Sequence, residues 1–261
     1  MPPSMAVEVI PGSDGGKGPR EFVAETFRVG CADPQLLLLM AVTALSVGIY
    51  DGWTGLLPQI LTSELPSPAD DTGSLDGSGD GGADWSTKDA GLCGMVQTLS
   101  CIAGQFVFGQ IADRFFVRRS KVLMVLLAAA ATIALGWAST MFDNPFVPWK
   151  ATPLHEDERW RVWVAISLAG ACRTGLVPLL YELSAELTYP VPEGTSAGLI
   201  VIAEHASLIV TLFAAQSVSL AAITCACWLG LALSTVLLLA VRPTYKRLNA
   251  EESSRKGATL Q

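Results

Sequence analysis

Long apolar stretches recur along the 261-residue chain and are separated by polar segments. A transmembrane α-helix needs about 20 consecutive, mostly apolar residues. The stretches are too long and too continuous for the alternating segments of a membrane β-barrel. The pattern therefore predicts an all-α integral membrane bundle of six helices. We expect these helices near residues 35–60, 89–112, 120–141, 161–187, 195–216 and 219–241.

The composition agrees with a membrane location. Hydrophobic residues make up 51% of the chain, charged residues make up 16%, and the mean hydropathy is +0.43. Ordinary soluble domains are less apolar and carry more charge. The formal net charge of −7 is unevenly spread, because acidic residues concentrate between Glu64 and Asp89. No basic patch is interleaved with aromatic residues, so we expect membrane lipid as a partner and no nucleic acid.

Basic residues predict the orientation of the chain. They precede the first span, follow the last span and fill the loop between the second and third spans. The positive-inside rule therefore places both termini in the cytoplasm. The expected organisation is a cytoplasmic tail at 1–34, a six-helix membrane domain at 35–241 and a second cytoplasmic tail at 242–261. An acidic outer loop at 63–86 has too little apolar surface to order itself, and we expect it to be disordered.

The sequence predicts no enzymatic or metal site. Its six cysteines lack the spacing of metal ligands, and the acidic loop lacks the EF-hand pattern. The segment 194–198 matches the G-x-S-x-G pattern of serine hydrolases, with His205 downstream. That motif requires a strand–turn–helix on an α/β sheet, which a helical membrane bundle does not contain. We therefore expect neither enzymatic activity nor a cofactor.

Ionisable residues inside membrane spans are costly, so each one marks a candidate functional site. In the first span, Asp51 shares a helical face with small residues such as Gly48 and Gly55. Gly and Pro weaken this segment, which is typical of a bent helix that lines a cavity. The alternative is that Asp51 pairs with a neighbouring helix or lies close enough to the membrane surface to be hydrated.

The fourth and fifth spans carry further ionisable residues. Arg173 and Glu182 lie nine positions apart, on opposite faces of the fourth span unless Pro178 kinks the helix, so we do not expect them to pair. In the fifth span, Glu204 precedes His205 within an apolar segment. The two side chains can exchange protons near neutral pH, and a structural hydrogen bond is the alternative.

A glycine-rich face and a charged motif lie in and after the second span. Gly91, Gly94 and Gly109 share a face of small residues, which predicts close helix packing. The segment 109–119 reads GQIADRFFVRR and is similar to the signature G-x-x-x-D-R-x-x-R-R of the major facilitator superfamily. The resemblance implies a gating motif that latches one conformation of an alternating-access cycle. Its residues are Gly109, Asp113, Arg114, Arg118 and Arg119.

A second segment resembles one family of these transporters. Residues 178–198 look like the region from helix 10 to helix 11 of the feline leukaemia virus subgroup C receptor-related family, which includes haem- and choline-associated carriers. The stretches 189–194 and 52–55 are most similar to its disrupted in renal carcinoma 2 branch. The resemblance implies that the six spans are equivalent to helices 7–12, the C-terminal half of a major facilitator fold.

The resemblance implies transmembrane transport of a small organic solute that is choline-, haem- or vitamin-like. The disrupted in renal carcinoma 2 branch further implies a proton-coupled symporter. We expect the solute to contact Tyr50, Asp51, Trp53 and His205, and protons to be carried by Glu182 and Glu204. The identity of the solute, the direction of transport, the coupling ion and the choice between lysosomal and plasma membrane remain open.

A major facilitator carrier binds its substrate between two six-helix halves, and this sequence contains one of them. Three interpretations are open. The chain is a half-transporter completed by a homodimer or a separate N-terminal half, or it is a truncated form of a full carrier. In the third interpretation it is a non-transport membrane protein that binds or regulates a partner.

Overall fold

The structure is a computed structural model, and its described part is helical. It describes residues 33–63, 87–116, 119–142, 159–189 and 192–242. Within these ranges all regular secondary structure is helical, and no strand occurs. The predictions for the two tails, the acidic outer loop and Arg118 fall outside the described residues.

Six helices in the described ranges are long and apolar enough to cross a membrane, and each overlaps one predicted stretch. The prediction of an all-α, six-helix membrane bundle equivalent to half of a major facilitator fold is confirmed. The spans are Pro34–Gly55, Lys88–Phe115, Ser120–Ser139, Trp160–Thr188, Glu193–Ala214 and Leu220–Ala240.

The first span is interrupted along its length. It consists of α2 (Pro34–Thr43), the π-helix η1 (Ala44–Gly48) and α3 (Ile49–Gly55), and α4 (Leu57–Ser63) follows after a turn at Leu56. A π-helical turn inside an α-helix is frequently found at functional sites. The other spans are regular: α5 (Thr87–Phe115), α6 (Ser120–Ser139), α7 (Arg159–Thr188), α8 (Glu193–Ala214) and α9 (Leu220–Ala240).

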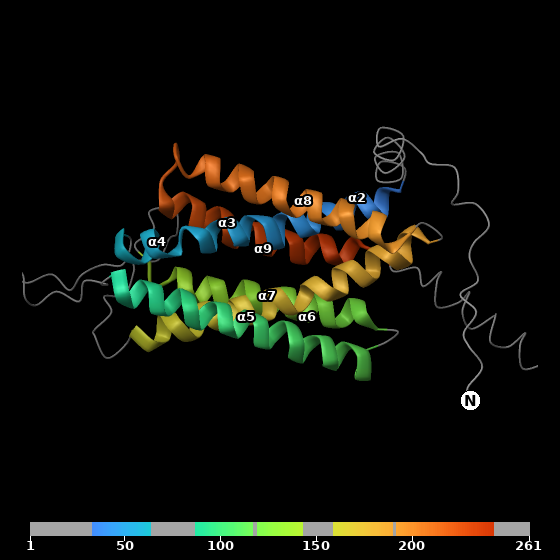
Figure 1. Cartoon of the computed structure of the whole chain (residues 1–261), viewed down its shortest axis with the longest axis horizontal. Helices are drawn as coiled ribbons and strands as arrows, with labels where there is room; N and C mark the ends of the chain where they lie inside the picture. The colour runs from blue at the N-terminus through green and yellow to red at the C-terminus, as the bar shows by residue number, and fades with distance from the viewer. Residues whose placement is uncertain (1–32, 64–86, 117–118, 143–158, 190–191, 243–261) are drawn as a thin grey trace, which may run out of the picture.

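The helices form two groups, which Figure 1 shows one above the other. One group contains α5, α6 and α7, and the other contains the first span, α8 and α9. Helix α7 packs most extensively against α5 and α6, and it also contacts α8 and the first span. Pro178 lies inside α7, which continues as a helix to Thr188. Helix α7 therefore connects the two groups and carries Arg173 and Tyr181 into the space between them.

Close packing of the second span does not occur where we predicted it. A Cβ atom built on Gly91, Gly94 or Gly109 would meet no atom of the described residues within 4 Å. The close approach is at Gly104, where a Cβ atom would lie 2.6 Å from the Cα atom of Ala171 in α7. The glycine spacing correctly indicated a helix with close contacts, but it did not reveal which face turns toward the bundle.

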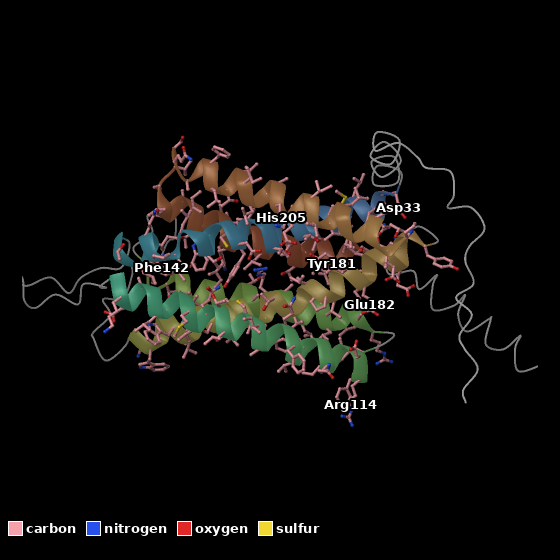
Figure 2. The ribbon with its side chains drawn as sticks, in the orientation of Figure 1. Asp33, Arg114, Phe142, Tyr181, Glu182 and His205 are labelled. Atoms are coloured by element: carbon pink, nitrogen blue, oxygen red, sulfur yellow. The ribbon has the colours of Figure 1, made fainter. Side chains whose placement is uncertain are left out.

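Polar contacts join three spans at one end of the bundle. Lys121, at the start of α6, donates to the carbonyl oxygens of Leu239 (2.8 Å) and Val241 (2.6 Å) at the end of α9. The backbone N–H of Arg242 donates to Gln35 Oε1 in α2 at 2.9 Å. These bonds satisfy backbone groups that a helix end leaves without partners. In Figure 2, Asp33 and Arg114 lie at this same end.

Candidate functional site

A buried ion pair joins the first span to the fourth. Arg173 Nη2 in α7 pairs with Asp51 Oδ1 in α3. The side chain of Arg173 is 6% exposed and that of Asp51 is 28% exposed. Removing a charge from water is costly unless an opposite charge compensates it, so each residue accounts for the presence of the other. Asp51 thus pairs with a neighbouring helix, which was the alternative to its lining a cavity.

Two aromatic side chains support this ion pair from the interior of the bundle. The guanidinium carbon of Arg173 lies 4.9 Å from the centroid of the Tyr50 ring, within the range of a cation–π interaction. The rings of Tyr50 and Trp53 are 5.5 Å apart, and Trp53 Nε1 donates to Thr224 Oγ1 in α9 at 3.0 Å. Both aromatic residues are fully buried. Their contact with a solute remains a prediction, and it requires a conformation in which they become accessible.

The fifth span contributes a second carboxylate. Tyr181 Oη in α7 donates to Glu204 Oε2 at 3.4 Å, and Glu204 is half-buried. His205 is exposed, and its Nδ1 lies 3.0 Å from the carbonyl oxygen of Val201. Because a carbonyl only accepts, Nδ1 carries the hydrogen in this contact. Figure 2 shows Tyr181 and His205 between the two ends of the bundle.

Small residues bring the two carboxylates together. A Cβ atom on Gly48 would lie 2.6 Å from the Cβ atom of Ser207 in α8, so only glycine permits this approach. Gly52 lies equally close to Thr211, and Ser207 Oγ donates to the carbonyl oxygen of Ala44 at 2.8 Å. The small-residue face of the first span therefore packs on α8. At this contact Asp51, Glu204 and His205 are close enough for electrostatic interaction.

The polar cluster, defined as Asp51, Arg173, Tyr181, Glu204 and His205, contains residues that we predicted and residues that we did not. Asp51, Glu204 and His205 were predicted from their charge within spans, whereas Tyr181 was missed and Arg173 had no assigned partner. Glu182, next to Tyr181 in α7, is exposed, and its role as a proton carrier remains a prediction.

One buried polar atom within the cluster, Arg173 Nε, has no hydrogen-bond partner among the described residues. Buried donors normally find an acceptor, so an unpaired donor indicates a place for water or for a bound group. The described residues contain no group of three or more His, Cys, Asp or Glu side chains that could hold a metal ion. The side chains of the cluster can pair charges, form hydrogen bonds and transfer protons.

A separate apolar groove of about 460 Å³ lies between the first span and α8. Met40, Ala44, Ala206 and Val210 are among the residues that line it, and no residue of the polar cluster is. The groove therefore differs from the cluster in its chemistry, although Ala44 and Ser207 both line it and form the contact with α8.

The predicted gating motif lies at the end of α5 and the start of α6. Asp113 and Arg114 are exposed, and the Arg114 guanidinium carbon lies 5.9 Å from the centroid of the Phe115 ring. Arg119 is exposed at the N-cap of α6, and Gly109 is half-buried. The gating role of these residues remains a prediction.

No protein-family profile matches this sequence. Comparison with curated proteins finds relatives among membrane transporters. Over 168 residues the chain is 27% identical to the solute carrier family 49 member 4 homolog of Xenopus laevis, covering 64% of this chain and 31% of that protein. Over 199 residues it is 24% identical to the choline/ethanolamine transporter flvcr2a of Danio rerio, covering 76% and 35% respectively.

A third relative is an uncharacterised MFS-type transporter of Caenorhabditis elegans. It is 22% identical over 175 residues, which are 67% of this chain and 24% of that protein. The chain thus spans about a third of the length of the first curated relatives that it matches. These matches confirm the resemblance that the motifs indicated: the chain is a multi-pass membrane protein related to the feline leukaemia virus subgroup C receptor-type solute carriers and to major facilitator transporters.

Proposed function

We propose that this chain forms one half of a major facilitator carrier that moves a small organic solute across a membrane. The observation that carries the proposal is the polar cluster, in which charged side chains from three spans meet inside the bundle. Ionisable groups within membrane spans mark substrate and ion pathways because their burial is otherwise unfavourable. The names of the relatives, which include choline/ethanolamine transporters, support a small organic cation as the solute.

A second six-helix unit would complete the carrier. Helices α5 and α8 are the least buried spans, with 17% of their most apolar segments buried, whereas the other four spans reach 39–56%. Both helices pack on α7 beside the cluster. A face that carries Glu204 and His205 is unfavourable against lipid, so we propose that a second copy or a separate N-terminal half covers it.

Within this carrier, we assign each predicted site residue a role from the exposure of its side chain. Asp51 and His205 have exposed surface and would contact the solute first, whereas Tyr50 and Trp53 would do so after the first span moves. The exposed carboxylate of Glu182 and the half-buried one of Glu204 are available as proton carriers. The charged motif from Gly109 to Arg119 would control opening at its end of the bundle.

Uptake by reconstituted carrier tests the proposal. The chain would be purified alone and with a candidate N-terminal half, its mass in detergent measured by light scattering, and each assembly tested for uptake of labelled choline and ethanolamine. Asp51→Asn should lower uptake at least tenfold, because it removes the charge that holds Arg173. Glu193→Gln, on the first turn of α8, is the matched control and should leave uptake unchanged.

Two results would count against the proposal. One is an assembly that transports equally well with Asp51→Asn, which would remove the cluster from the pathway. The other is a chain that carries no solute in any assembly but binds another membrane protein, which would favour the regulatory interpretation.

A further inference from the structure

The two carboxylates of the polar cluster are not equivalent. Asp51 has a guanidinium as its partner. Glu204 has no salt bridge among the described residues and receives one hydrogen bond, from Tyr181 at 3.4 Å. That distance exceeds the usual 2.5–3.0 Å of an O–H···O bond. Glu204 is therefore the carboxylate whose charge the protein leaves largely uncompensated.

The charged and titratable groups that act on Glu204 come from α3, α7 and α8 itself. Asp51 lies on α3, Arg173 and Tyr181 lie on α7, and His205 is the next residue of α8. When both carboxylates are ionised and His205 is neutral, Arg173 balances one of them and a net negative charge remains. In a low-dielectric interior such a charge is unfavourable. A proton on Glu204 removes it, and so does the positive group of a bound solute.

A second, independent feature points to a bound group at the same place. Only 5% of the surface of Arg173 is exposed. Its Nε–H has no hydrogen-bond partner among the described residues. The same guanidinium pairs with Asp51 and interacts electrostatically with Glu204, so the unpaired donor belongs to the same site. An acceptor oxygen on the solute would satisfy this donor. The cluster thus offers a carboxylate for a cation and an N–H for an oxygen.

We propose that Glu204 is the exchange point of the site, where its carboxylate holds either a proton or the cationic group of a monovalent organic solute that carries an acceptor oxygen. This inference rests on the proposed transport function. When the cation enters, the Glu204 O–H bond breaks and the proton leaves to water; when the cation leaves, the carboxylate takes a proton back. Proton and solute therefore compete, and coupling through Glu204 is exchange rather than the symport that the family resemblance implies.

Asp51 and His205 do not meet the same requirements. Arg173 stays charged at all accessible pH values, so the Asp51 carboxylate keeps its partner whether or not solute is bound. The His205 side chain contacts the Val201 carbonyl oxygen through Nδ1, and an imidazole does not supply the negative charge that balances a cation. Comparing His205→Gln with Glu204→Gln separates the contribution of His205 from that of Glu204.

Binding measurements on the full chain in lipid nanodiscs test the inference, with choline as the probe. Calorimetry in two buffers of different ionisation enthalpy gives both the Kd and the number of protons released. The Kd should rise by up to tenfold for each unit of acidification, with release of about one proton, as one-site competition requires. The uncharged carbon analogue of choline should release none. Glu204→Gln should abolish the proton release and weaken choline binding at least tenfold at neutral pH, whereas Glu204→Asp should retain both effects.

Two further variants complete the comparison. Glu193→Gln, which removes a carboxylate at the N-terminal end of the same helix, is the control and should preserve proton release. His205→Gln removes the ionisable group next to Glu204 and should preserve proton release even where it changes the Kd for choline. Proton release that persists in Glu204→Gln, or that is lost in His205→Gln, would overturn the exchange role of Glu204. Choline binding that releases no proton in the unsubstituted chain would overturn it as well.

The outcomes also separate this inference from the proposed function. If choline displaces a proton from Glu204 but no assembly carries choline across a membrane, the transport function fails and the exchange role stands. If uptake occurs without competition by protons, the exchange role fails and the transport function stands. Absence of both binding and uptake, for choline and ethanolamine alike, would overturn both.

Discussion

At the scale of single residues, the Asp51–Arg173 pair makes a specific prediction about stability. Arg173→Met would leave the Asp51 carboxylate inside the bundle without its counter-charge. Removing one partner of a buried ion pair costs about 3–5 kcal/mol, whereas replacing both partners is often nearly neutral. We therefore expect Arg173→Met to lower the thermal unfolding temperature in detergent strongly. The double variant Asp51→Asn, Arg173→Met should recover most of the loss.

Arg114 provides the matched control, because its side chain is exposed and its guanidinium lies over the Phe115 ring of the same helix. Arg114→Met should change the unfolding temperature little. A double variant no more stable than Arg173→Met would show that the guanidinium stabilises the bundle by packing on Tyr50 and not by its charge.

The same residues show how much of the site the sequence could predict. Asp51, Glu204 and His205 were identified because charged groups are rare within membrane spans. The partner of Asp51 was not, because Arg173 lies 122 positions away and their meeting depends on how α3 crosses α7. Tyr181 carried no signal, since a tyrosine in a span is common and its hydrogen bond to Glu204 exists only in the folded bundle.

At the scale of helices, the contact between the first span and α8 depends on glycine. A methyl group on Gly48 would lie 2.6 Å from the Ser207 Cβ atom, so Gly48→Ala must push α8 away. Overpacking of this kind costs about 1–3 kcal/mol. At Gly55 the nearest atom, Leu212 Cδ2, would be 3.8 Å from the new Cβ, which is an ordinary contact. We expect Gly48→Ala to lower the thermal unfolding temperature and Gly55→Ala to leave it nearly unchanged. Equal effects of the two variants would contradict the close approach.

The helices also show which structural features a hydrophobicity pattern does not predict. All six spans were predicted because their apolar length is set by the thickness of the bilayer. A bend in the first span was expected between Gly48 and Pro58, and the turn at Leu56 lies in that segment. The π-helix that begins at Ala44 was not predicted. The Ala44 carbonyl accepts a hydrogen bond from Ser207 in another helix. A local pattern does not contain that tertiary contact, so it cannot predict where the π-helix begins.

At the scale of the whole molecule, the two faces of α5 should respond differently to the same substitution. Gly104 packs against α7, with 2.6 Å between its hypothetical Cβ atom and Ala171 Cα. At Gly94, no atom of the described part of the chain lies within 4 Å of such a position. Gly104→Leu should therefore unfold or strongly destabilise the chain by itself. Gly94→Leu should leave the thermal stability of the isolated chain unchanged, because its side chain would point into open space.

In an assembled carrier the comparison becomes a test of where the second half docks. If another six-helix unit covers the face with Gly91, Gly94 and Gly109, a leucine at Gly94 would keep the two units apart, since small residues are what let membrane helices approach closely. Light scattering should then give the mass of the complete assembly for the unsubstituted chain and the mass of the single chain for Gly94→Leu. An unchanged assembly mass would place the partner on another face of the chain. Some other protein surface would then have to shield Glu204 and His205 from lipid.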